Sequence, residues 1–169
     1  TIVVDYGPDE LDAGDHVISS RVCYIGVHGL LVDHLAKRYG FQVSLVDTTR
    51  PREVKAALRP NTKLIHVETP ANPTTFVSDI EAMAGIARGA GAILSVDSTF
   101  SGLVMQQPLK LGADLVAHSL TKYINGHGDG LGGAVIGRQD LIRRMQEVAS
   151  IHLGATISPF NAWLIMRST

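Results

Sequence analysis

The chain has one cysteine, little charge and no long apolar run, and each shortage excludes a class of protein. Cys23 has no second cysteine to pair with, so no disulfide can form within the chain. That fits a reducing compartment, and we expect a cytoplasmic protein. No run approaches the ~20 apolar residues of a membrane span, and no segment is typical of a signal peptide. The net charge of -1 gives no indication of a nucleic-acid surface.

What is present is an ordinary globular composition. Apolar residues make up 45% of the 169 residues and charged residues 18%, which is enough for one domain with a core. Glycine and proline are scattered, and we find no repeat, low-complexity tract or interdomain linker. The sequence therefore predicts one domain, or a piece of one.

Short apolar runs alternate along the chain with segments of helical periodicity. The expected strands are 15–20, 41–47, 63–68, 92–97, 114–119 and 134–137. The expected helices are about 27–39, 51–58, 79–88 and 141–149. Ser78 and Glu81 fit a capping box at the start of the third helix. Alternating strands and helices predict an α/β fold with a mostly parallel sheet covered on both faces.

Such a sheet binds ligands at the carboxyl ends of its strands. Glu68, Asp97 and Ser119 end three of the expected strands. An acid such as Asp97 at the end of a buried strand is costly unless it is paired. One partner would be the protonated ring nitrogen of pyridoxal phosphate, and the alternative is an aspartate that caps the next turn.

The segment 113–133 (ADLVAHSLTKYINGHGDGLGG) holds one of only five lysines. Lys122 follows a strand end, between nearby hydroxyls and a glycine-rich loop. We expect this lysine to be partly desolvated, which would favour the neutral, nucleophilic amine that Schiff-base chemistry needs. The alternative is a surface lysine in a loop, which composition alone favours.

Four motifs together closely resemble the Cys/Met-metabolism family of pyridoxal-phosphate enzymes. They are ETPANP (68–73), VDSTF (96–100), LGADLVAHSLTKY (111–123) and INGHGD (124–129). The resemblance runs from about Leu11 to Arg167, while the first ten residues, TIVVDYGPDE, do not match. It implies that 11–169 is the large cofactor domain of a fold-type-I enzyme, a three-layer sandwich like that of aspartate aminotransferase. The family's upstream phosphate loop and its C-terminal domain are not found here.

The resemblance also implies the residues that hold the cofactor. Lys122, in the S-x-T-K-Y motif, would form the internal aldimine and then move protons on the substrate. Ser119 and Thr121 would bind the phosphate. Asp97 would pair with the pyridine nitrogen, and Thr99 would lie close to the ring.

Three further positions follow from the resemblance. Asn72 would bind the 3-oxygen of the ring, and Glu68 would support its turn. Tyr24 would stack on the ring and act as an acid toward the leaving group, although an ordinary half-buried tyrosine at a helix start is the alternative. Gly26 stands where many methionine γ-lyases have a cysteine.

Two rival patterns point to other chemistry. Gly128, Gly130 and Gly133 fit a dinucleotide-binding fingerprint, but they lead into a strand rather than a helix. His127 and Asp129, with His118 or His152, could suggest a metal site, but their spacing matches no ligand pair on a helix, and we expect no metal site.

The resemblance implies a pyridoxal-phosphate-dependent lyase that performs γ-elimination on a small sulfur amino acid, most like methionine γ-lyase. Cystathionine γ-lyase and cystathionine γ-synthase are the alternatives, and a non-catalytic α/β scaffold is the alternative from another class. The family implies a homotetramer with shared active sites, and we expect neither a nucleic acid nor a membrane as a partner.

Overall fold

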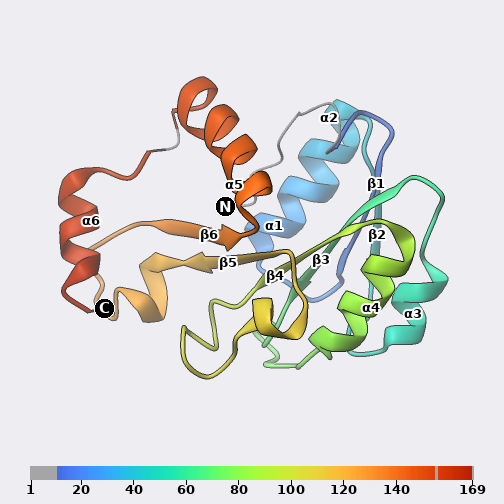
Figure 1. Ribbon diagram of the computed structural model, residues 1–169, viewed down its shortest axis with the longest axis horizontal. Coiled ribbons are helices and arrows are strands. Elements are labelled where there is room, and N and C mark those ends of the chain that lie inside the picture. The colour runs from blue at the N-terminus through green and yellow to red at the C-terminus, as the bar shows by residue number, and fades with distance from the viewer. Residues whose placement is uncertain (1–10, 155, 169) are drawn as a thin grey trace.

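A computed structural model describes residues 11–154 and 156–168 and contains one mixed six-stranded sheet (Figure 1). The strands are β1 (His16–Ser20), β2 (Gln42–Val46), β3 (Thr62–Glu68), β4 (Ile93–Asp97), β5 (Leu115–Ser119) and β6 (Gly133–Gly137). The longer helices are α3 (Pro51–Ala56), α4 (Ile80–Ala90), α5 (Gln139–Gln146) and α6 (Pro159–Met166). Shorter helical segments are α1 (Ile25–Gly29), η1 (Leu30–Ala36), α2 (Lys37–Tyr39), η2 (Pro108–Leu111), η3 (Leu120–Ile124) and η4 (Glu147–His152).

The strand order is β2-β1-β3-β4-β5-β6, and every neighbouring pair is parallel except β5 with β6. The predicted α/β class with a mostly parallel sheet is therefore confirmed, and each expected strand differs from the observed one by no more than a residue at either end. Since parallel neighbours need crossover connections, helices lie on both faces of the sheet (Figure 1).

Each face of the sheet has its own buried apolar cluster. The cluster on one face joins β1, β3, β4 and β5 to α3 and α4, and includes Ile65, Leu94 and Met83, all fully buried. The cluster on the other face packs α1 and η1 against β1 and β3 through residues such as Val17 and Leu31. The odd and even residues of each strand thus face different helices, as the period of a strand requires.

The capping box expected at Ser78 is wrong. Asp79 is the N-cap of α4, and its side chain accepts a hydrogen bond from the backbone N–H of Ala82. Ser78 is instead buried, where its hydroxyl bonds the hydroxyl of Thr48 at 2.8 Å and its N–H donates to Thr69 Oγ1. A buried hydroxyl takes up these neighbouring groups and leaves the helix start to the exposed carboxylate.

Three elements were not expected from the sequence. η2 begins at Pro108 and leads into β5, η3 follows β5 directly, and α6 begins at Pro159 with Ser158 as its N-cap. α6 lies apart from the other helices, beyond the end of the sheet where β6 begins (Figure 1).

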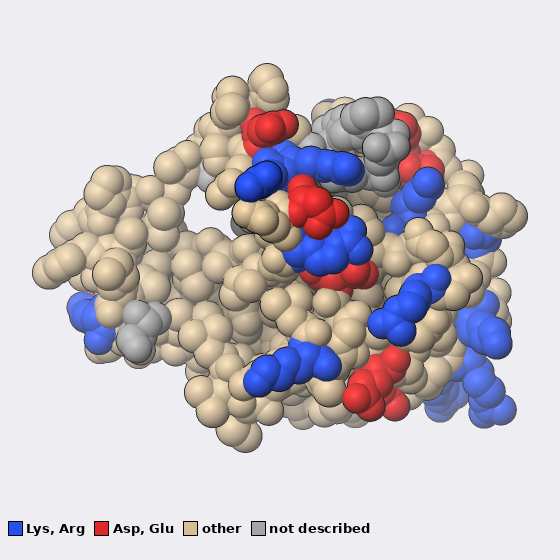
Figure 2. Space-filling view, in the orientation of Figure 1, with Lys and Arg blue, Asp and Glu red and all other residues tan. Residues whose placement is uncertain are grey.

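In Figure 2 the part of the molecule formed by α6 has few charges, whereas positive and negative side chains are mixed elsewhere on that face. None of the helices in the described part of the chain has the length and apolar character that crossing a bilayer requires.

Candidate functional site

Three strands end side by side with polar groups. Glu68 of β3 pairs in register with Asp97 of β4, which pairs with Ala117 of β5, and Ser119 lies two residues further along β5. The valine that precedes each of Glu68, Asp97 and Ala117 is buried beneath α3 and α4. The three residues therefore point to the opposite face, where α1 lies.

Glu68 joins two segments that are far apart in the sequence. Its Oε1 accepts a hydrogen bond from the N–H of Asn72 at 2.6 Å, and its Oε2 accepts one from the N–H of Tyr24, also at 2.6 Å. Glu68 thus contacts the turn that carries Asn72. Burial raises the pKa of Glu68, and nearby Asp97 adds to this rise, while the two N–H bonds oppose it.

A second set of bonds links Asp97 to the end of β5. The Oδ1 atom of Asp97 accepts the N–H of Thr99 at 2.9 Å, and Thr99 Oγ1 accepts the N–H of Ser119 at 2.9 Å. Within the described part of the chain, Asp97 Oδ2 has no hydrogen-bond partner. The carboxylate is thus fixed in orientation with one oxygen available to a ligand.

Lys122 lies in η3, just beyond β5, with φ -96° and ψ -118°, outside the helical region. Its side chain is exposed, so the expected partial desolvation is wrong for the described residues. The reason is its position beyond the strand end, in a turn that no described segment covers. Its neighbour Thr121 is held firmly, because the Thr121 hydroxyl donates to Gly132 O at 3.2 Å and accepts from Gly132 N at 3.1 Å.

Tyr24 forms the N-cap of α1 and is 53% exposed. A Cβ added to Gly26 would lie 2.5 Å from Cε1 of the Tyr24 ring. The ring therefore occupies the space that a side chain at residue 26 would need, and its present position depends on the glycine.

Two buried histidines flank Asp97. The sequence interpretation weighed His118 only as a metal candidate and gave His66 no role. His66 of β3 is fully buried, with Nδ1 3.3 Å from Ser95 Oγ and Nε2 without a partner in the described residues. Burial lowers the pKa of His66 to about 4 and lowers the pKa of His118, while Asp97 acts against both shifts. Both rings are therefore neutral near pH 7. The signal for His66 was a polar residue at the centre of an otherwise apolar run.

His127 and Asp129, the weighed metal candidates, take part in protein contacts instead. His127 Nδ1 lies 2.8 Å from Asn125 O, and Asp129 binds Arg167. In residues 11–154 and 156–168, no three His, Cys, Asp or Glu side chains are grouped in a way that could hold a metal ion.

The donor set fits pyridoxal phosphate. An amine (Lys122) can bind an aldehyde, a carboxylate with a free oxygen (Asp97) can pair with a cationic ring nitrogen, and an exposed aromatic ring (Tyr24) can cover a planar ring. All three groups lie at the carboxyl ends of β1, β4 and β5 or in the segments that follow these strands. Nothing in this geometry selects the substrate.

Comparison with known proteins agrees with this arrangement. The family model described as "Cys/Met metabolism PLP-dependent enzyme" matches residues 9–169. A canavanine γ-lyase of Rhizobium leguminosarum is 55% identical over 94% of this chain and 40% of its own length. An L-methionine γ-lyase of Porphyromonas gingivalis is 47% identical over 92% of this chain and 39% of its own.

Among solved structures, cystathionine γ-lyase from Lactobacillus plantarum, complexed with L-serine, superposes with a TM-score of 0.88 at 35% identity. The match covers 94% of this chain and 41% of that one. The chain thus spans about 40% of the length of the curated relatives that it matches.

Proposed function

Because this chain belongs to the Cys/Met-metabolism family of pyridoxal-phosphate-dependent enzymes, we propose that its protein catalyses γ-elimination from an amino acid that carries a leaving group on Cγ. The observation that supports this most directly is the placement of Lys122, Asp97 and Tyr24 at the carboxyl ends of the strands. The canavanine γ-lyase and the L-methionine γ-lyase named above are 55% and 47% identical to this chain over the aligned residues, which make up 40% and 39% of their own lengths.

In this proposal five residues hold the cofactor directly. Lys122 binds its aldehyde carbon, Asp97 its ring nitrogen, Asn72 its 3-oxygen, and Ser119 and Thr121 its phosphate. Pyridoxal phosphate, when bound, supplies an electron sink conjugated with the substrate Cα. The Thr121 hydroxyl proton donates to Gly132 O in this structure, so to bind a phosphate oxygen the hydroxyl would turn that proton to the phosphate and keep the hydrogen bond that it accepts from Gly132 N.

The other residues of the site orient these groups. Glu68 fixes Asn72 and Tyr24 at one distance from each other, because its two oxygens bind both backbone N–H groups. Thr99 lies beside the ring and links Ser119 to Asp97. Its Oγ1 accepts a hydrogen bond from the N–H of Ser119, and its own N–H donates to Asp97 Oδ1.

Proton movement falls to Lys122 and Tyr24. The Lys122 amine takes a proton from the substrate Cα and moves a proton at Cβ, as a general base and acid. The Tyr24 hydroxyl donates a proton to the heteroatom that leaves Cγ. Its side chain is 53% exposed, so the ring is accessible to a substrate.

For the substrate, we propose canavanine and methionine as the two leading candidates. In the first, the Cγ–O bond breaks and hydroxyguanidine leaves, and in the second, the Cγ–S bond breaks and methanethiol leaves. The relative named for canavanine is 55% identical and the one named for methionine 47%. Gly26 also favours a site that differs from many methionine γ-lyases, because the Tyr24 ring lies where a cysteine side chain would be.

A cytoplasmic homotetramer is part of this proposal. We also propose a small-molecule substrate. The L-methionine γ-lyase that is 47% identical to this chain supports this, because methionine is a small amino acid. The Lys122 side chain is exposed among the described residues, so a neighbouring subunit could pack against it in the homotetramer.

The test is a product assay on the full-length protein with canavanine, methionine, cystathionine and an O-acylhomoserine offered in parallel. We expect a visible absorbance band near ~420 nm from the bound cofactor and release of hydroxyguanidine or methanethiol. Lys122→Ala should remove both the band and the activity, and Lys110→Ala, an exposed lysine of η2, should keep both. A colourless protein that ignores added pyridoxal phosphate would instead support the non-catalytic scaffold.

A further inference from the structure

The glycine-rich segment that follows Lys122, residues 125–132, is bound at both ends to α6 and to the residues just after that helix. We call this segment the lysine loop. Arg167 Nη2 lies 2.7 Å from both carboxylate oxygens of Asp129, and Ser168 Oγ donates to Asn125 O at 2.7 Å. Asn161 Nδ2 donates to Leu131 O at 3.2 Å. These contacts come from residues more than 29 positions away in the sequence.

The interior of the lysine loop is ordered around Asn125, which is fully buried. Its Nδ2 donates to His127 O at 2.9 Å and to Asp129 Oδ1 at 3.2 Å. The carboxylate of Asp129 therefore receives hydrogen bonds from inside the loop and from Arg167 at once. Shared contacts of this kind transmit a change at Arg167 to the backbone around Asn125.

The same backbone fixes the turn that carries Lys122. The N–H of Gly126 donates to Lys122 O at 2.9 Å, and the N–H of Asn125 donates to Leu120 O at 2.9 Å. The Lys122 side chain is exposed and has no hydrogen bond or ion pair among the described residues. Its amine is therefore placed by the backbone of the turn, not by packing around the side chain.

We propose that Arg167 is a positioning residue, which acts through Asp129 and Asn125 to hold the Lys122 turn in the geometry that the reaction needs. This inference rests on the proposed function, since it concerns where the amine of Lys122 lies. The Arg167–Asp129 pair is partly exposed, at 38% and 46% of the two side chains. Exposed pairs add little stability, so the effect should appear in the reaction and the loop more than in the stability of the fold.

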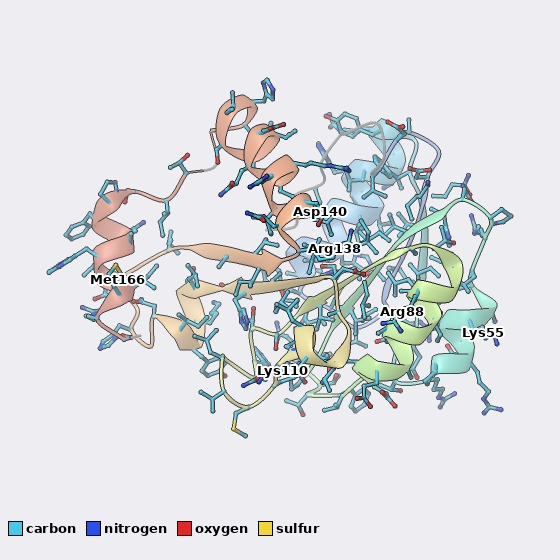
Figure 3. All side chains as sticks on the ribbon, viewed as in Figure 1. Lys55, Arg88, Lys110, Arg138, Asp140 and Met166 are labelled. Atoms are coloured by element: carbon cyan, nitrogen blue, oxygen red, sulfur yellow. The ribbon has the colours of Figure 1, made fainter. Side chains whose placement is uncertain are left out.

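The chain offers a matched control in Arg138. It pairs with Asp140 at 3.0 Å and with Asp114 at 3.2 Å, and it is also partly exposed. Figure 3 shows Arg138 and Asp140 at the base of α5, at the far end of β6 from Met166 in α6. Arg138→Ala thus removes an arginine–carboxylate pair of the same kind without touching the lysine loop.

The test compares Arg167→Ala, Asp129→Ala, the exchanged pair Arg167→Asp with Asp129→Arg, and Arg138→Ala, all in the full-length protein. Hydrogen exchange of residues 120–132 is measured in the cofactor-free protein, and kcat, KM and the Kd for pyridoxal phosphate in the loaded enzyme. We expect each single variant of the pair to speed exchange in 120–132, to lower kcat about tenfold, which corresponds to ~1.4 kcal/mol, and to leave KM within about twofold. The exchanged pair should recover most of kcat, and Arg138→Ala should match the wild type.

Faster exchange with unchanged kcat in Arg167→Ala would overturn the proposal, since the loop would then be loosened without consequence. Unchanged exchange would overturn it as well. Should Arg167→Ala fail to fold, Asp129→Ala tests the same pair from its other side. A visible band that survives Lys122→Ala would instead refute the proposed function, and this outcome does not depend on Arg167.

Discussion

At the scale of single residues, Cys23 shows how the neighbourhood of Asp97 acts on a group that takes no part in the proposed chemistry. Its thiol is half-buried beside Ser19. Burial, together with the nearby carboxylates of Glu68 and Asp97, raises the pKa of Cys23 to about 11, although a hydrogen bond with Ser19 opposes the rise. The thiol is therefore protonated at neutral pH, and the only cysteine of the chain should be unreactive.

We expect Cys23 to react with iodoacetamide at pH 8 about a hundredfold more slowly than a free thiol, because a shift of two pKa units lowers the thiolate fraction by that factor. The rate should still be rising with pH above pH 10. The full-length protein in urea is the control, since unfolding removes both burial and the two carboxylates. A rate at pH 8 equal to that of the unfolded protein would contradict this environment.

The candidate site could be predicted from the sequence where a residue ends a strand. Glu68 and Asp97 follow apolar runs, and parallel strands bring such ends together. The partners of each residue could not be predicted, because they depend on how distant segments meet: Glu68 binds the N–H of Tyr24, 44 residues away. The exposure of Lys122 was missed for the same reason, since it depends on what covers the turn.

At the scale of elements, the start of α4 gives a direct comparison of two interpretations. The sequence favoured Ser78 with Glu81, whereas the structure uses Asp79, whose Oδ1 accepts the N–H of Ala82 at 2.9 Å. Both patterns place an oxygen near the first turn, and the tertiary contacts of Ser78 with Thr48 decide between them.

We therefore expect Asp79→Ala to lower the free energy of unfolding by about 1 kcal/mol, through loss of the cap and of a negative charge at the helix start. Glu81→Ala should cost only about 0.3 kcal/mol, because its carboxylate contributes only through the helix dipole. Urea unfolding of both variants measures the difference. Equal losses would indicate that the capping box is present after all.

The strands were predicted well because short apolar runs bounded by glycine or polar residues are typical of buried strands in an α/β fold. α6 was not predicted, because PFNAWLIM is apolar nearly throughout and has no helical alternation. Two of its aromatic residues, Phe160 and Trp163, are 65% and 67% exposed. Because apolar residues lie on the exposed side of this helix as well as on its buried side, its sequence lacks the amphipathic pattern that predicts a surface helix.

At the scale of the whole molecule, three histidines lie buried within the sheet, on β1, β3 and β5. They are His16, His66 and His118, and burial lowers the pKa of each. All three should be neutral in the folded state near pH 7 and should resist protonation in acid. In the unfolded chain these histidines take up protons at their ordinary pKa. Acid therefore favours the unfolded state, which binds more protons.

His66 gives the largest part of this effect. A histidine with a lowered pKa contributes stability that is present above its unfolded pKa of 6.5 and is lost as pH falls through its folded pKa of about 4. Between these two values the folded state should lose about 3 kcal/mol from this ring alone, at 1.36 kcal/mol for each pKa unit. The nearby carboxylate of Asp97 opposes the lowering of the His66 pKa, and the value of about 4 already includes this effect.

We expect the free energy of unfolding of the full-length protein to fall steeply from pH 6.5 to pH 4, and His66→Gln to make that fall shallower. Glutamine keeps a polar side chain opposite Ser95 but cannot take up the proton. The measurement is urea unfolding at half-unit pH steps, with His34→Gln as the control, since His34 lies in η1 and outside the buried set of the sheet. A His66→Gln profile parallel to the wild type would mean that the acid sensitivity comes from elsewhere in the fold and that burial does not lower the pKa of His66.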